Sequence, residues 1–169
     1  MTRLFLIGYR CVGKTTVTRL LAEQWGWDWI DADAELERIA GKSIRRVFDE
    51  EGEPSFRDRE SAVLVALCER ERLVIATGGG VVLRPENRER LKSGKVVWLS
   101  ASADVIWRRM QTDATTGARR PNLAQGGLAE VESLLAAREP LYRSCADLRV
   151  ETTDRSPEEI ASAIIFKST

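Results

Sequence analysis

Hydrophobic and polar positions along the chain follow two alternating patterns. Short apolar or alternating segments typical of buried strands occur at 4–7, 27–31, 73–76, 96–99 and 148–150. Elsewhere apolar residues recur every three or four positions, as at Val17, Leu20 and Leu21, which is the spacing of one helical face. Strands that alternate with helices from end to end predict an α/β domain with a parallel sheet and right-handed crossovers.

Glycine, proline and polar residues mark where the helices begin and end. We predict helices over 35–39, 43–48, 55–70, 85–94, 105–110 and 129–137. Gly52 separates the second of these from the third. A last helix begins after Ser156, with Pro157 at its first position and Glu159 placed to complete a capping box. The polar segment 112–127 predicts a mobile loop over a site rather than a linker.

Composition narrows the class of protein. The 169 residues are enough for a substantial core, so we expect a single domain over 1–169. The 26 basic and 26 acidic residues balance, which argues against bulk attraction to nucleic acid or an anionic membrane. No apolar run approaches the ~20 residues of a membrane span. The three cysteines form no C-x-x-C pair and indicate a reducing cytoplasm. We therefore expect a cytoplasmic protein without a nucleic-acid or membrane partner, and we also expect a monomer.

Residues 8–15 read G-Y-R-C-V-G-K-T and complete the G-x-x-x-x-G-K-[ST] pattern of a phosphate-binding loop. In such loops backbone N–H groups and the lysine surround the phosphates, and the last hydroxyl can ligate Mg²⁺, so Lys14 and Thr15 take these roles here. A predicted strand precedes the loop and a predicted helix follows it, which directs the helix dipole at the phosphates. This context favours nucleoside triphosphate binding over a chance match.

Three segments suited to ligand binding follow predicted strands: the phosphate loop, the acid pair Asp31 and Asp33, and the triple glycine 78–80. In a parallel sheet these strand ends meet at one edge, where ligands bind. Because side chains two apart on a strand point the same way, we expect both carboxylates to leave the sheet together. One can hold Mg²⁺ and the other can orient or deprotonate a substrate hydroxyl; the chain has no histidine for that task. A solvated turn with two acids is the alternative.

Arg57 and Glu60 lie three apart on a predicted helix and share a face. Glu60 can hold the Arg57 fork toward a carboxylate ligand, and a surface ion pair is the alternative. The triple glycine 78–80 lets a ligand approach backbone N–H groups closely, although a plain tight turn would use the same residues.

Two further arginines lie next to prolines. Arg138 falls at a predicted helix end just before Pro140, where by itself it is a partner of the helix dipole. Arg120 precedes Pro121 in the predicted mobile loop. A lid arginine can contact the transferring phosphoryl group, and a solvated loop charge is the alternative.

Together these segments resemble the shikimate kinase family across essentially the whole chain. The matching segments are 8–16, 31–33, 41–48, 52–60, 78–80, 120–121 and 138–142, in the order and spacing of the family. The resemblance implies a three-layer P-loop kinase fold, with a five-stranded parallel sheet in the order 2-3-1-4-5 flanked by helices. It implies transfer of the ATP γ-phosphoryl group to the 3-hydroxyl of shikimate, in aromatic amino-acid biosynthesis. The family usually has glycine where this chain has Cys11.

The resemblance also implies roles for particular residues. Those implied for the acceptor, partly within a substrate segment of about 33–60, are Asp33, Arg57, Gly78, Gly79, Gly80 and Arg138. Those implied for the nucleotide are Gly8, Cys11, Val12, Gly13, Lys14, Thr15, Thr16, Arg109, Arg120, Arg155 and Pro157. Those implied for Mg²⁺ are Thr15 and Asp31. Those implied for catalysis are Asp33, Lys14 and Arg120, the last on a lid at about 112–127.

Three other classes of protein compete with this interpretation. Another small-metabolite kinase with the same core, such as a gluconate kinase, also takes a carboxylated polyol, but the segments 57–60 and 138–142 argue against it. A regulatory GTPase would resemble its relatives in an N-K-x-D guanine motif, which this sequence lacks. A binding module without activity is disfavoured because Lys14, Thr15 and Arg120 are all present.

Overall fold

Five strands form one parallel sheet. The computed structural model describes residues 2–113 and 126–167. Its strands are β1 (Arg3–Ile7), β2 (Asp28–Asp31), β3 (Leu73–Ala76), β4 (Lys95–Ser100) and β5 (Leu148–Glu151), in the order β2-β3-β1-β4-β5. Every neighbouring pair is parallel, which confirms the expected sheet. The central strand β1 leads directly into the phosphate loop.

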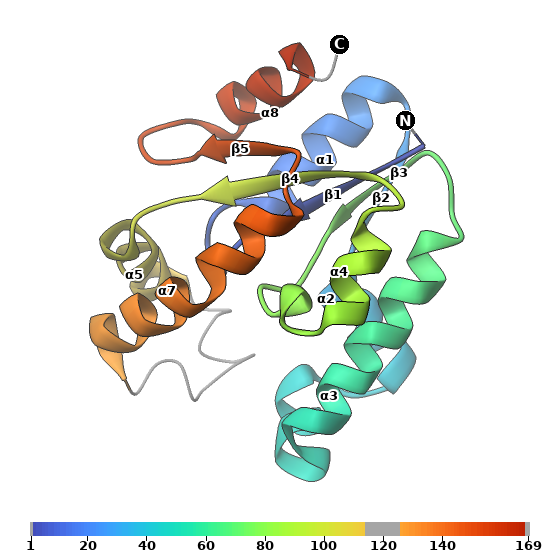
Figure 1. Ribbon diagram of the computed structural model, residues 1–169, viewed down its shortest axis with the longest axis vertical. Helices are drawn as coiled ribbons and strands as arrows, with labels where there is room; N and C mark the ends of the chain where they lie inside the picture. Colours follow the sequence, from blue (N-terminus) through green and yellow to red (C-terminus); the bar gives the residue numbers. More distant parts are fainter. Residues whose placement is uncertain (1, 114–125, 168–169) are drawn as a thin grey trace.

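Helices cover both faces of the sheet (Figure 1). They are α1 (Lys14–Trp25), α2 (Ala32–Ala40), α3 (Ile44–Cys68), α4 (Pro85–Leu91), α5 (Ala103–Thr112), α7 (Gly127–Cys145) and α8 (Pro157–Phe166), with a short 3-10 helix η1 at Val81–Leu83. α1 and α8 lie on one face, and α3 and α4 lie on the other (Figure 1). Helix–sheet–helix layering is the expected three-layer arrangement.

Alternating residues of β1 fill two separate cores. Leu4 and Leu6 pack in the core formed with α1, α5 and α8, whereas Phe5 and Ile7 pack in the core formed with α3 and α4. All four are fully buried, as expected for a parallel strand with both faces covered. α7 contributes to both cores, because its first half packs in the first and Tyr142 in the second. The middle of α7 therefore lies between the two cores.

α7 corrects the prediction that a helix ends near residue 137, ahead of Pro140. The helix continues to Cys145 with Pro140 inside it. A proline in a helix interior loses one backbone hydrogen bond, but Val131 and Leu135 before it and Tyr142 after it are buried. Burial on both sides of the proline favours a continuous helix, so Arg138 lies within α7 and not at its end.

The predicted break at Gly52 is confirmed as an interruption within α3. Gly52 has φ 82° and ψ 172°, which is not helical. The predicted capping box at Ser156 and Glu159 is present at the start of α8. Of the predicted loop 112–127, residues 114–125 lie outside the described part of the chain. Within the described residues, no helix combines the length and the apolar character needed to cross a membrane.

Candidate active site

The phosphate loop joins the buried strand β1 to the start of α1, and its backbone explains its glycines. Gly8 has φ 142°, and a Cβ there would overlap the carbonyl oxygen of Leu99 on β4. Gly13 has φ 89° and immediately precedes α1. Cys11 also takes a positive φ, 58°, and Val12 is buried in the core. The loop therefore closes tightly at the N-terminus of α1, where backbone N–H groups and the helix dipole favour anions.

Lys14 and Thr15 are both held by oxygen atoms at this edge. The Lys14 ammonium donates hydrogen bonds to the carbonyl oxygens of Gly8 (2.8 Å) and Tyr9 (2.6 Å). The Thr15 hydroxyl donates to Oδ2 of Asp31 at 2.7 Å. These contacts bring the end of β2 against the start of α1, as the predicted site requires.

The structure corrects the expected geometry of the acid pair. Asp31 ends β2, but Asp33 lies in the first turn of α2 and is not on a strand. Oδ1 of Asp31 accepts hydrogen bonds from the backbone N–H groups of Asp33 (2.9 Å) and Ala34 (3.2 Å), so Asp31 caps α2. Because this cap starts α2 directly after Asp31, Asp33 does not continue the alternation of the strand. Both residues are half-buried, and Asp31 contacts the phosphate loop through Thr15.

Arg57 is buried and paired, so the alternative of a surface ion pair is wrong. Arg57 and Glu60 are 8% and 6% exposed, and Nη1 of Arg57 lies 2.8 Å from Oε1 of Glu60. Glu53, four residues before Arg57 on α3, lies 3.4 Å from Nη2 of Arg57. Glu53 was assigned no role from the sequence. A Cβ on Gly80 would overlap the guanidinium of Arg57. Arg57 is therefore held firmly against the triple glycine.

Arg138 approaches the same glycine segment from α7. It is 8% exposed, its guanidinium lies 5.6 Å from the ring centroid of Tyr9, and Nη1 lies 3.5 Å from where a Cβ of Gly79 would be. The hydroxyl of Tyr142, one helical turn later, donates to the carbonyl oxygen of Gly79 at 2.6 Å. Two buried guanidinium groups thus flank the glycines beside the phosphate loop. The i,i+4 spacing of Arg138 and Tyr142 is the signal that could have revealed the tyrosine.

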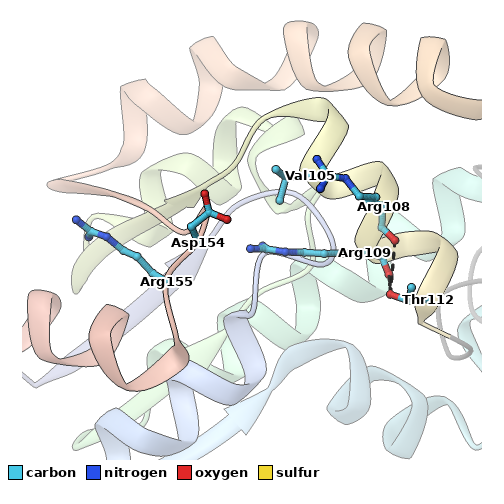
Figure 2. Close-up of a pocket in the computed structure, with 6 residues that line it drawn as sticks. All are labelled: Val105, Arg108, Arg109, Thr112, Asp154 and Arg155. Atoms are coloured by element: carbon cyan, nitrogen blue, oxygen red, sulfur yellow. Dashed lines mark hydrogen bonds between the residues drawn. The ribbon is translucent and has the colours of Figure 1, made fainter.

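A separate cleft of about 400 Å³ opens beside the phosphate loop (Figure 2). Its lining residues are Val105, Arg108, Arg109, Thr112, Asp154 and Arg155. Arg109 donates to the carbonyl oxygen of Cys11 at 3.1 Å, and also to the hydroxyl (3.2 Å) and the carbonyl oxygen (3.1 Å) of Thr152. Arg109 and Arg155 thus come together as expected. The buried Thr152 was missed because nothing in the sequence marks it.

Other predicted residues lie elsewhere. Pro157 begins α8 and is not among the residues that line this cleft. Thr16 is exposed on the first turn of α1. Arg120 lies outside the described residues.

Comparison with known proteins identifies the family. The shikimate kinase family model matches residues 10–168. The chain belongs to the shikimate kinase family. A shikimate kinase of Rhodopirellula baltica is 46% identical over 96% of this chain and 88% of its own length.

Solved structures agree with this assignment. A shikimate kinase from Acinetobacter baumannii in complex with shikimate has a TM-score of 0.93 and 38% identity, covering 99% of this chain and 93% of that one. A gluconokinase from Sinorhizobium meliloti has a TM-score of 0.62 and 20% identity, and so shares the fold alone. The shikimate kinase interpretation is therefore confirmed at the level of the family, and the gluconate kinase alternative is not supported.

Proposed function

We propose that this protein transfers the γ-phosphoryl group of ATP to the 3-hydroxyl of shikimate. The observation that carries the proposal is the pair of buried arginines, Arg57 against Gly80 and Arg138 near Gly79, next to the phosphate loop. A small carboxylated polyol fits this arrangement, because guanidinium forks bind a carboxylate with good geometry. Backbone groups at Gly79 and Gly80 are then close enough to contact the ligand.

Asp33 is our candidate for the group that orients or deprotonates the acceptor hydroxyl. It lies in the first turn of α2, two residues after the carboxylate that accepts a hydrogen bond from Thr15. Positioned carboxylates perform this task in kinases. The chain contains no histidine that could replace it.

The nucleotide phosphates would lie at the N-terminus of α1, with Lys14 among their ligands. The base would lie in the cleft that Arg109 and Arg155 line. Arg120 is proposed to contact the transferring phosphoryl group, from the sequence pattern alone.

Thr15 and Asp31 are the residues that would hold Mg²⁺. Their side-chain oxygens lie 2.7 Å apart, and Mg²⁺ prefers such oxygen ligands, taking one or two from the protein and the rest from water and phosphate. Among the described residues, no group of three or more acidic, cysteine or histidine side chains forms a protein-only metal cage. When bound, Mg²⁺ supplies positive charge that neutralises the β- and γ-phosphates.

The cellular localisation and the oligomeric state are inferred from the sequence alone. We infer a monomer in the cytoplasm, and a reducing compartment is consistent with Cys11, Cys68 and Cys145, none of which forms a disulfide.

Measuring ADP release with shikimate, with gluconate and without an acceptor tests the proposed function. We expect ADP release that depends on shikimate, with gluconate close to the acceptor-free background. Equal or faster release with gluconate would favour the alternative kinase, and equal release in all three reactions would contradict a shikimate kinase activity.

A further inference from the structure

The hydrogen bond from Tyr142 to Gly79 lies at the centre of the proposed acceptor site. Tyr142 is fully buried, and its hydroxyl donates to the Gly79 carbonyl oxygen at 2.6 Å. Its ring is held by packing, with the Trp98 ring centroid 5.8 Å away. The ring position therefore does not depend on the hydroxyl. The hydroxyl contributes a specific hydrogen bond to the backbone of the triple glycine.

This contact fixes the direction of a peptide group. The peptide between Gly79 and Gly80 is trans, as are all those described, so the Gly79 carbonyl and the Gly80 N–H point in opposite directions. When Tyr142 holds the carbonyl, the Gly80 N–H must point away from Tyr142. Gly80 itself lies against the guanidinium of Arg57.

Two consecutive glycines need such an anchor. Gly80 has φ −97° and ψ 6°, and rotating the Gly79–Gly80 peptide by half a turn would make its φ positive. Glycine adopts positive φ about as readily as negative φ, so side-chain sterics do not prevent the rotation. The same small residues that admit a ligand therefore leave the direction of their N–H groups undetermined.

We propose that Tyr142 is a positioning residue that holds the Gly79–Gly80 peptide so that the Gly80 N–H faces the acceptor. Arg138 and Tyr142 lie one turn apart on α7, and Nη1 of Arg138 and the Tyr142 hydroxyl lie 3.5 Å and 3.6 Å from where a Cβ of Gly79 would be. One helix thus supplies both an arginine proposed to bind shikimate and the hydroxyl that orients the backbone of the triple glycine. This inference rests on the proposed function, because it assigns the oriented N–H to shikimate binding.

Tyr142→Phe removes only the hydroxyl, and Thr77→Val is a matched control. Thr77 is buried two residues before Gly79, and its hydroxyl donates to the Leu6 carbonyl oxygen at 3.0 Å. Each variant thus deletes one buried bond from a hydroxyl to a carbonyl. Thermal unfolding of both variants shows that they fold and how much stability each loses.

We expect Tyr142→Phe to raise the KM for shikimate by about 5- to 30-fold, because an interaction made in both the ground and transition states is lost. We expect kcat to change less than about threefold and the KM for ATP less than about twofold. Thr77→Val should leave all three constants near those of the wild type. In ¹⁵N-labelled protein, shikimate should slow hydrogen exchange of the Gly80 amide in the wild type and not in Tyr142→Phe.

An unchanged KM for shikimate in Tyr142→Phe would overturn the inference and leave the hydroxyl a purely structural role. An equal rise in KM in Thr77→Val would also overturn it, because any lost buried hydrogen bond would then have the same effect. If the wild type showed no ADP release dependent on shikimate, the proposed function itself would fail, and the inference with it.

Discussion

Cys11 stands in the phosphate loop where the backbone is left-handed. Its φ is 58°. In this region the backbone conformation costs a residue with a Cβ about 1–2 kcal/mol more than it costs glycine. Its carbonyl accepts a 3.1 Å hydrogen bond from Arg109, and its thiol lies 3.8 Å from a carboxylate oxygen of Asp113. Contacts to the side chains of Arg109 and Asp113 therefore offset part of the strain, and Arg109 also lines the proposed nucleotide cleft.

Asp33 provides the first test at the scale of one residue. Asp33→Asn removes the proposed acceptor of the hydroxyl proton but keeps the size of the side chain. We expect kcat to fall by about 10²–10⁴, while the Kd for Mg-ATP, measured by calorimetry, stays near the wild-type value. Asp28→Asn, the same change at the start of β2, is the control and should leave kcat unaltered. A kcat for Asp33→Asn within about threefold of wild type would refute the assignment.

Arg138 provides a second test, which separates binding from chemistry. Arg138→Ala should raise the KM for shikimate by about 10- to 100-fold, since a hydrogen bond to a charged group contributes about 1.5–3 kcal/mol. The KM for ATP should hardly change. Arg143→Ala, an exposed arginine on the same helix, is the control. If steady-state kinetics showed a large fall in kcat with an unchanged KM, Arg138 would act on the transition state instead.

At the scale of elements, α3 carries both Arg57, which is proposed to bind shikimate, and a break in its backbone at Gly52. The φ and ψ of Gly52 (82°, 172°) lie in a region essentially restricted to glycine. Glu51 bridges the break by accepting 3.0 Å hydrogen bonds from Nε and Nη2 of Arg59 and a 2.6 Å bond from Ser55. Arg57 lies in the same half of the helix as Arg59. The Glu51 contacts therefore hold that half in place.

This network predicts a pH dependence of stability. Hydrogen bonds from Arg59, Lys42 and Ser55 lower the pKa of Glu51 to about 2. A carboxyl with a lowered pKa stabilises the folded state above its unfolded pKa, near 4.5, and that stability is lost as the pH falls toward 2. Glu51→Gln should therefore unfold at lower urea than wild type at pH 7, and the difference should close between pH 4.5 and 2. A constant difference over this range would contradict the prediction. At pH 7, 1 M salt should reduce the difference between the two proteins.

Elements were predictable where a local pattern decides them. The strands follow from short apolar or alternating segments, and the start of α8 follows from its capping box. Asp33 was misplaced because the cap that Asp31 forms on α2 overrides the alternation of a strand. The end of α7 was misplaced because Pro140 is a strong local stop signal, whereas the burial of Tyr142 beyond it depends on the whole fold. Tertiary packing decided both cases.

At the scale of the whole molecule, the two proposed sets of ligand contacts both adjoin the phosphate loop. The residues proposed for the acceptor come from α2, α3, the end of β3 and α7, and Arg57 and Arg138 lie against glycines next to the core that contains Phe56 and Tyr142. The cleft assigned to the nucleotide is lined by α5 and the turn before α8. Because few side chains are shared, each ligand should stabilise the protein through its own set of contacts.

Thermal unfolding with each ligand tests this separation. A ligand present at 100 times its Kd stabilises the native state by about 2.7 kcal/mol, which should raise Tm by roughly 5–10 °C for a chain of this size. At the same concentrations, a tenfold loss of affinity halves that stabilisation. Arg138→Ala should therefore lose half or more of the shift caused by shikimate and keep the shift caused by Mg-ADP. Arg109→Ala should show the reverse, with each shift measured from the variant's own ligand-free Tm. Equal loss of both shifts in either variant would mean that the two sets of contacts form a single binding unit.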